Sequence, residues 1–222
     1  AFFHKYKHTK PYIRLKVGVS IDGKIADEKK ESKWITSKES RNFVQELRAE
    51  VNGIITTSNT VISDNPKMNI RDNQVLKKTI SQPALIILDS KLRVPTKANI
   101  FKTDRLIIIV ADIKYASSTP LRIYKDNVVI KYVKTKNSKI NLKDIYAIAK
   151  TYHLDDLLVE SGSIFSATLL SANAVDEIIY LVAPKILGSK GLTFSGINPI
   201  DKLKDKKSYK IKNIKSYKND LC

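Results

Sequence analysis

Four consecutive residues, Glu160 to Ser163, have the composition of a turn that binds an anion. They stand where a predicted strand over residues 155–160 meets a predicted helix over residues 163–173. The first N–H groups of a helix have no partner within it, and the helix dipole favours negative charge there. The turn can therefore hold a phosphate group, although Ser163 could equally be an ordinary helix cap. The pattern is not G-x-G-x-x-G, so it does not predict a Rossmann fold.

A second polar region lies in the first third of the chain, between Lys16 and Arg71. Gly18 falls inside a predicted strand, where a glycine often marks the close approach of a ligand or another backbone. A short apolar run then leads into the sequence Thr-Ser-Asn-Thr at residues 57–60, which offers hydroxyl and amide groups together. These features are typical of a small-molecule site.

Regular spacing predicts the elements that would position these residues. Alternation of apolar and polar residues predicts a strand over residues 12–19. Its predicted buried face carries Ile13, Leu15, Val17 and Val19, and its other face carries Lys16, Gly18 and Ser20. Thr36 and Glu39 have the spacing of a capping box, which predicts a helix over residues 37–50.

Strands and helices alternate along most of the remaining chain. Further predicted strands lie near residues 52–57, 84–89, 105–110, 128–133, 155–160, 176–183 and 208–216, and further predicted helices lie near residues 141–152 and 163–173. Asn141 can cap the first of these helices. This order predicts an α/β fold in one domain, with a mainly parallel central sheet, flanking helices and an antiparallel edge.

The chain is strongly basic, with 40 Lys and Arg against 22 Asp and Glu and a formal net charge of +18. Such a balance can indicate a nucleic-acid partner. The basic residues are spread through the sequence and no nucleic-acid motif accompanies them, so we do not expect that partner. A positive field would also attract small molecules that carry phosphate.

Cys222 is the single cysteine, which excludes an internal disulfide and a cysteine-based zinc site. His4, His8 and His153 are scattered along the sequence, so we expect no metal. The longest apolar run, residues 106–111, is far shorter than the roughly 20 residues that span a bilayer. We therefore expect a cytoplasmic protein without a membrane segment.

A series of short motifs also runs along the chain in a defined order. They are Lys16–Lys24 (KVGVSIDGK), Ser32–Thr36 (SKWIT), Leu47–Ala49, Thr60–Val61, Asp64–Pro66, Arg71, Leu158–Ser163, Val175–Ile178 and Ala183–Gly188. In this order and spacing they resemble the reductase half of the bifunctional riboflavin-biosynthesis deaminase/reductase. The resemblance covers nearly the whole chain.

The resemblance implies a dihydrofolate-reductase-like fold, a homodimer, and NADPH-dependent reduction of 5-amino-6-(5-phosphoribosylamino)uracil to its ribityl counterpart. We interpret residues 1–10 as the remnant of a linker from an upstream deaminase domain, and residues 11–222 as the reductase domain. The deaminase half uses a zinc site built from His and Cys. This chain could not supply such a site, so we expect it to lack deamination activity.

The resemblance also assigns residues to ligands. Those for NADPH are Gly18, Trp34, Thr60, Asp64, Ser90, Gly162, Ser163 and Ile164, and those for the phosphoribosylamino-pyrimidine substrate are Ser32, Arg48, Met68, Arg71 and Glu160. Two arginines suit bidentate capture of a phosphate, although an arginine on a helix is usually solvated. Trp34 could instead pack in the core, and Thr60 and Asp64 could simply cap or turn the chain.

Lys16 and Glu160 are the candidates for proton handling, because both are ionisable and both should project near strand ends beside the cofactor. The alternative is a structural ion pair between them. Two other functions also stay open. One is reduction of the diaminopyrimidine nucleotide before deamination, by the related stand-alone reductase. The other is a basic, non-catalytic domain that binds a nucleotide or RNA.

Overall fold

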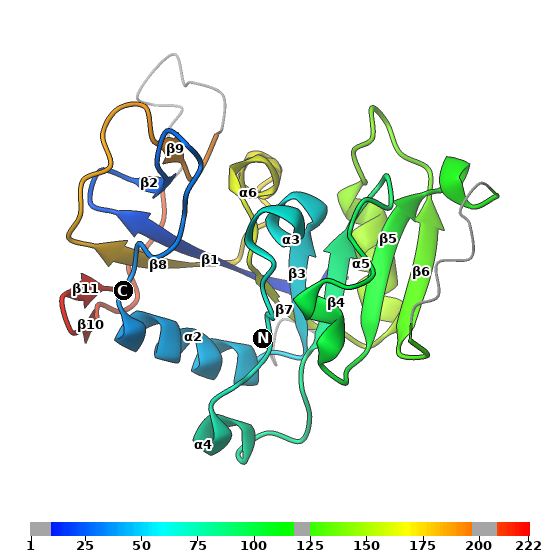
Figure 1. Ribbon diagram of the computed structural model, residues 1–222, viewed down its shortest axis with the longest axis horizontal. Helices are drawn as coiled ribbons and strands as arrows, with labels where there is room; N and C mark the ends of the chain where they lie inside the picture. Colours follow the sequence, from blue (N-terminus) through cyan, green and yellow to red (C-terminus); the bar gives the residue numbers. More distant parts are fainter. Residues whose placement is uncertain (1–9, 118–124, 197–207) are drawn as a thin grey trace. The chain divides into compact units, whose positions relative to one another are not determined.

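The computed structural model describes residues 10–117, 125–196 and 208–222 (Figure 1). The chain forms two compact units, and each unit is made of two separate stretches. Unit 1 comprises Ala1–Arg14 and Phe43–Ser161, and unit 2 comprises Leu15–Asn42 and Gly162–Cys222. Most of the predicted linker over residues 1–10 lies outside the described residues, so that interpretation stays a prediction.

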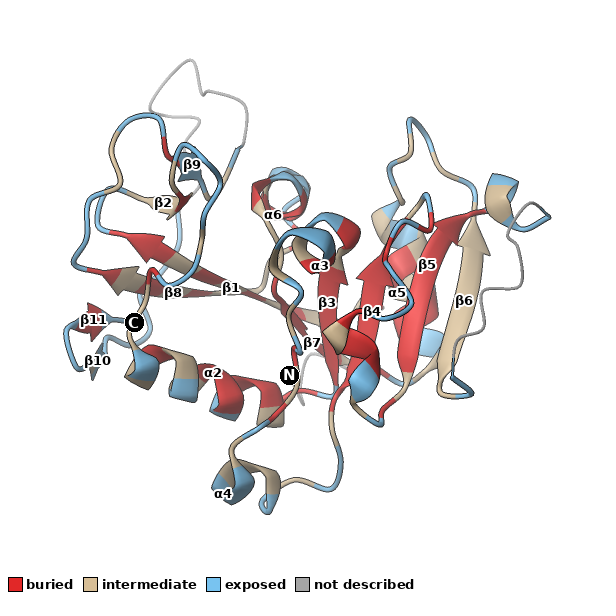
Figure 2. Cartoon of the chain, in the orientation of Figure 1, coloured by how far each residue is buried: buried red, intermediate tan, exposed pale blue. Residues whose placement is uncertain are grey.

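Unit 1 is built around a parallel sheet. Its strands are β3 (Gly53–Thr57), β4 (Ala84–Leu88), β5 (Ile107–Asp112), β6 (Val128–Val133) and β7 (Asp156–Val159), in the order β7-β3-β4-β5-β6. Each adjacent pair is parallel, with Ile55 opposite Ile86 and Val159. β4 and β5 are buried along their whole length (Figure 2). Burial on both faces explains why β4 is apolar throughout and β5 is apolar up to its last residue, Asp112.

Helices connect these strands within unit 1. They are α3 (Ser58–Asp64), α4 (Asn73–Leu76), α5 (Leu142–Thr151), the 3-10 helices η1 (Asn99–Lys102) and η2 (Ile113–Tyr115), and residues Phe43–Ala49 of α2 (Lys38–Ala49). The predicted cap of α5 is confirmed, because the Asn141 side chain accepts the Lys143 N–H. α3 and α4 were not expected. Each is short and is started by a capping side chain, Thr57 and Asp72 respectively.

Unit 2 contains the antiparallel part of the structure. β1 (Tyr12–Ser20, of which residues 15–20 belong to this unit), β8 (Glu177–Ala183), β10 (Ser216–Tyr217) and β11 (Asp220–Leu221) follow the order β10-β11-β8-β1. The pairs β10–β11 and β11–β8 are antiparallel. A separate antiparallel pair joins β2 (Lys24–Ala26) to β9 (Leu192–Thr193), and α6 spans Ser163–Ser171. The predicted α/β class, with a parallel sheet and an antiparallel edge, is therefore confirmed.

The predicted faces of β1 are correct with one exception. Its four apolar residues are buried, as the alternation requires. Ser20, expected on the polar face, is also fully buried. Its hydroxyl donates to the Asp22 carboxylate at 2.5 Å and accepts the Lys24 N–H at 3.0 Å. Ser20 therefore stabilises the turn that follows the strand.

The predicted start of α2 is wrong by one residue. The cap is Ser37 and not Thr36, because the Ser37 hydroxyl accepts the Ser40 N–H at 3.2 Å. Asp220 completes this helix start, since its Oδ2 receives the Ser37 N–H and the Ser40 hydroxyl, both at 2.6 Å. Burial alone would raise the pKa of Asp220, but these hydrogen bonds outweigh it and hold the pKa below its usual value.

The strand predicted over residues 208–216 is also wrong. Residues 208–215 are exposed and lie outside any strand, and only the short β10 begins at Ser216. A stretch in which apolar residues are interspersed with basic ones suits a half-buried strand only where a core covers one face. Along this stretch both faces are exposed, so the pattern has nothing to bury.

None of the helices in the described part of the chain combines the length and the apolar composition that crossing a membrane requires.

Candidate functional site

A buried ion pair in unit 1 joins the last turn of α2 to the end of β7. Arg48 donates from Nε to Oε1 of Glu160 at 2.7 Å and from Nη2 to Oε2 at 3.0 Å. Each residue is 7% exposed. Buried charges are stable only when they are paired and hydrogen-bonded, and two parallel bonds give the strongest arginine–carboxylate pair. The carboxyl group of Glu160 is thus held in one orientation.

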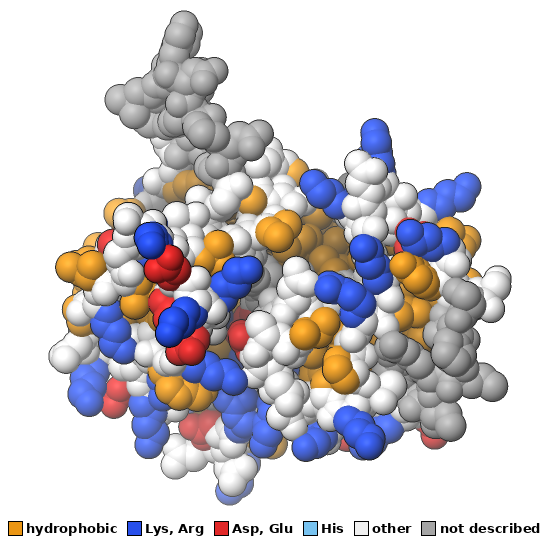
Figure 3. All heavy atoms as spheres, turned by 45° about the horizontal axis from the view of Figure 1, so that its top comes forward, with side chains coloured by type: hydrophobic (Ala, Val, Ile, Leu, Met, Phe, Trp, Pro, Cys, Tyr) orange, Lys and Arg blue, Asp and Glu red, His pale blue; other side chains and the backbone are white. Residues whose placement is uncertain are grey.

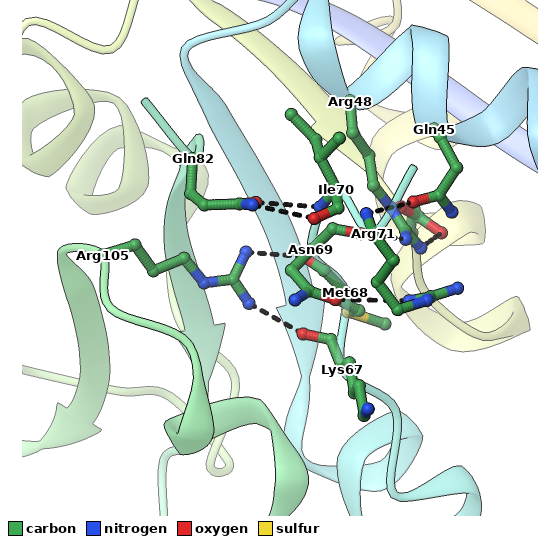
Figure 4. Close-up of polar contacts among 10 residues, drawn as sticks. Gln45, Arg48, Lys67, Met68, Asn69, Ile70, Arg71, Gln82 and Arg105 are labelled. Atoms are coloured by element: carbon green, nitrogen blue, oxygen red, sulfur yellow. Dashed lines mark hydrogen bonds and ion pairs between the residues drawn. The ribbon is translucent and has the colours of Figure 1, made fainter. Parts of the chain in front are cut away.

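The ion pair continues into a segment without helix or strand, Lys67–Arg71, which we call the strap (Figure 4). Nη1 of Arg48 donates to the Asn69 carbonyl oxygen at 2.9 Å. The strap carries both Met68 and Arg71. The structure therefore brings together in unit 1 the predicted substrate residues Arg48, Met68, Arg71 and Glu160, whereas the fifth, Ser32, belongs to unit 2.

Arg71 is the exposed cation of this group. Its Nη1 donates to Oδ1 of Asn69 at 3.3 Å, and its Nε and Nη2 have no hydrogen-bond partner among the described residues. Partial burial and then the charge of Arg48 lower the pKa of Arg71, while Glu160 raises it. Arg71 therefore offers donors to an anion. Arg48 is different, because its guanidinium is already engaged by Glu160 and Asn69.

A third arginine supports the strap from the other side. Arg105, two residues before the start of β5, donates from Nη1 to the Met68 carbonyl and from Nη2 to the Lys67 carbonyl, the latter at 3.0 Å. Burial, followed by repulsion from Arg48, lowers the pKa of Arg105 to about 9, and attraction to Glu160 opposes that shift. Arg105 therefore keeps its charge at neutral pH although it is buried.

The predicted cofactor residues of unit 1 lie near the carboxyl ends of parallel strands, where α/β sheets commonly bind ligands. Thr60 and Asp64 are in α3, which follows β3 directly, and Ser90 follows β4. Thr60 has a local contact as well, since its hydroxyl lies 3.1 Å from that of Thr57. Nearby, Arg93 donates from Nη2 to Ser58 Oγ at 3.0 Å and Asn59 Oδ1 at 2.6 Å.

The predicted cofactor residues at the start of α6 belong to unit 2. Gly162 is the N-cap, and no side chain caps this helix, so the expectation that Ser163 might be an ordinary cap is wrong. A Cβ at Gly162 would meet no atom within 4 Å. Ile164, in the first turn, is 70% exposed. The helix start is therefore open in the way that binding of a phosphate requires.

Two further predicted cofactor residues have very different surroundings in unit 2. Trp34 is 65% exposed, so it does not pack in the core. The Arg41 guanidinium lies 4.4 Å from the centre of its ring, and Lys185 Nζ donates to its carbonyl oxygen at 2.9 Å. Gly18 has a local reason to be glycine, because a Cβ would stand 3.3 Å from Cγ2 of Thr36.

Lys16 and Ser32 are half-buried residues of unit 2, with Lys16 on the polar face of β1. The shared role in proton handling predicted for Lys16 and Glu160 stays a prediction. Within the described residues, no group of His, Cys, Asp or Glu has the arrangement of a metal site.

Sequence reasoning did not identify Gln45, Gln82 or Arg105, all of which contact the strap. The two glutamines belong to no motif and lie far apart in the sequence. Arg105 had a signal, because it directly precedes an apolar run that becomes a fully buried strand. A charged residue at that point is expected to be paired.

The sequence also matches a known family. The family model of the RibD C-terminal domain matches residues 11–216. The chain belongs to this family. RibD of Buchnera aphidicola subsp. Baizongia pistaciae is 31% identical over 236 residues, which cover 99% of this chain and 60% of that protein. A protein of Buchnera aphidicola subsp. Acyrthosiphon pisum named 5-amino-6-(5-phosphoribosylamino)uracil reductase is 34% identical over 192 residues, covering 83% of this chain and 90% of that protein.

Solved structures of RibD support the same family assignment. Acinetobacter baumannii RibD, form 1, has a TM-score of 0.84 and 28% identity, over 99% of this chain and 59% of that one. The predicted fold is thus confirmed, and the chain spans about three fifths of the length of these RibD proteins. The Saccharomyces riboflavin biosynthesis reductase Rib7 shares the fold, with a TM-score of 0.68 at 20% identity.

The surface of this RibD C-terminal domain is basic without a single basic stripe on the face seen in Figure 3. Lys and Arg side chains are interspersed there with acidic, hydrophobic and uncharged ones. Nucleic-acid-binding domains typically gather their basic residues on one face or along one helix. This face therefore gives no support to the RNA-binding alternative.

Proposed function

We propose that this chain reduces 5-amino-6-(5-phosphoribosylamino)uracil to 5-amino-6-(5-phosphoribitylamino)uracil, with NADPH as the hydride donor. The observation that carries the proposal is the 34% identity to a protein named as the reductase of that substrate, over 90% of its length. The reductases among the relatives support a nicotinamide cofactor in general. NADPH rather than NADH is our extension.

The residues at the start of α6 fit the phosphates of such a cofactor. Ser161 Oγ is buried and has no hydrogen-bond partner among the described residues. It directly precedes Gly162 in the sequence, and no side chain caps the first turn of α6. The free backbone N–H groups of that turn suit a phosphate. Gly162, Ser163 and Ile164 would then hold the pyrophosphate, and Thr60, Asp64 and Ser90 would hold other parts of the dinucleotide.

The chemistry asks for position more than for reactive groups. The cofactor, when bound, supplies a hydride to the first carbon of the opened sugar. Arg71 would bind the substrate's phosphate with its unpartnered donors. Glu160, fixed by Arg48, would orient the pyrimidine ring, and Lys16 would deliver the proton. Orientation of this kind can account for most of the acceleration of a hydride transfer.

The proposal also covers the oligomeric state, the cellular compartment and the partner domain. We propose a homodimer in the cytoplasm that works with a deaminase domain upstream of residue 11. The length of the RibD relatives beyond the matched part supports the deaminase partner.

The decisive experiment follows loss of NADPH absorbance with the deaminated and the amino form of the phosphoribosylamino-pyrimidine in parallel. Turnover of the deaminated form alone is expected. Turnover of the amino form alone would instead establish the reductase that acts before deamination. Tight binding of NADPH or RNA without turnover of either form would establish a binding domain and refute the proposal.

A further inference from the structure

The strap is held by side chains from other parts of unit 1 and not by regular backbone pairing. Gln82 contacts it twice, accepting the Ile70 N–H at Oε1 and donating from Nε2 to the Ile70 carbonyl, both at 2.8 Å (Figure 4). Gln45, on α2, accepts the Arg71 N–H at 2.8 Å. Arg48 and Arg105 supply the remaining contacts, as described above.

These contacts fix two successive peptide groups completely. In the peptide group between Asn69 and Ile70, Arg48 binds the carbonyl and Gln82 binds the N–H. In the peptide group between Ile70 and Arg71, Gln82 binds the carbonyl and Gln45 binds the N–H. Both peptide planes that precede the Cα of Arg71 are therefore held at their carbonyl oxygen and at their N–H group. Arg105 fixes the two carbonyls that precede them.

Burial makes these bonds costly to lose. Ile70 is 2% exposed and Met68 5%, so the backbone here has little access to water. A buried backbone group that loses its partner is not compensated by water, so its loss is destabilising. The strap thus has one well-defined position, although it is neither helix nor strand. Asn69 adds to this from its own side, since its Nδ2 donates to Thr103 Oγ1 at 3.0 Å.

We propose that Gln82 and Arg105 are positioning residues for recognition of the substrate's phosphate. They hold the strap so that the Arg71 guanidinium stands at a fixed place beside the Arg48–Glu160 pair. Neither residue needs to contact the substrate. This inference rests on the proposed function, because it takes Arg71 as the ligand of the phosphate.

Gln82 is the better residue to test, because it is half-buried whereas Arg105 is buried. Gln82→Met keeps the length of the side chain and removes both hydrogen bonds to Ile70. Gln74→Met is the matched control, since the Gln74 side chain is exposed on α4. Gln82→Glu keeps the acceptor for the Ile70 N–H and loses the donor to its carbonyl, so it tests half of the contact.

The measurement compares kcat/KM for the phosphorylated substrate and for its dephosphorylated analogue. Misplacement by about 1 Å can cost on the order of 100-fold in rate. We therefore expect Gln82→Met to lower the ratio of the two values by about 10- to 100-fold, Gln82→Glu to lower it less, and Gln74→Met to leave it unchanged. A merely structural role would reduce the active fraction for both substrates alike and leave the ratio as in the wild type.

A double-mutant cycle with Arg71→Ala asks whether Gln82 acts through the arginine. Once Arg71 is gone, Gln82→Met should lower the phosphate discrimination no further. An unchanged ratio in Gln82→Met, or an equal further loss in the Arg71→Ala background, would overturn the inference. A wild-type chain that reduces neither form would refute the proposed function itself, which is a distinguishable result.

Discussion

Breaking the Arg48–Glu160 pair from one side should destabilise the protein strongly. Glu160→Gln keeps the shape of the side chain and removes its charge, which leaves Arg48 as a buried cation with side-chain exposure of 8%. Two charge-assisted bonds of 2.7 and 3.0 Å are weakened or lost. Loss of one partner from a buried pair costs about 3–5 kcal/mol, which is roughly a 150- to 5,000-fold change in the folding equilibrium.

The assay is urea unfolding followed by tryptophan fluorescence and circular dichroism. Arg48→Met combined with Glu160→Leu is the matched comparison, because replacing a buried pair with apolar side chains is often neutral for stability. We expect the double variant to be more stable than Glu160→Gln and still inactive. A loss below about 1 kcal/mol for Glu160→Gln would refute the reasoning, because it would mean that water or another group compensates Arg48.

Three other predictions follow from single contacts. We expect the Arg93 guanidinium, which Ser58 and Asn59 hold, to bind the phosphate that NADPH has and NADH lacks. Arg93→Ala should therefore lower the preference for NADPH over NADH, measured as the ratio of their KM values, about tenfold; an unchanged ratio would exclude this role. Asp220 has a lowered pKa, so it stabilises the fold above its ordinary pKa of 3.8, and that contribution is lost as pH falls through the lower native value. Ser40→Ala should therefore move acid unfolding to higher pH, as circular dichroism would show. Gly53→Ala should cost about 1–3 kcal/mol in thermal unfolding, because its Cβ would stand 2.6 Å from Leu157 Cδ2.

The sequence correctly predicted the elements whose apolar residues have a core to pack against. The alternation in β1 and the apolar runs of β4 and β5 predicted strands correctly, because a core covers them as the pattern requires. Residues 208–216 also mix apolar and basic residues but lack that cover, and the prediction failed there. A local pattern reports what a segment could bury, whereas the presence of a neighbour is a property of the whole fold.

The candidate site was predictable to a similar extent. Motifs indicated Arg48, Arg71 and Glu160, but not that Arg48 would bind Glu160 and leave Arg71 as the exposed cation. Gln82 and Arg105 were missed because their partners are backbone groups of a distant segment, which have no sequence signature. Contacts between a side chain and a distant backbone are set by topology, and spacing along the chain cannot reveal them.

The way in which the strap is held limits how this part of the chain can change in length. Surface loops usually accept insertions and deletions, because water can satisfy their backbone groups. The four successive carbonyls from Lys67 to Ile70 are matched to donors on three residues elsewhere in unit 1, Arg105 for the first two, Arg48 for the third and Gln82 for the fourth. One added or deleted residue would shift every later group away from its partner. Length variation among natural or engineered versions of this domain should therefore stop at Lys67 and resume only after Arg71.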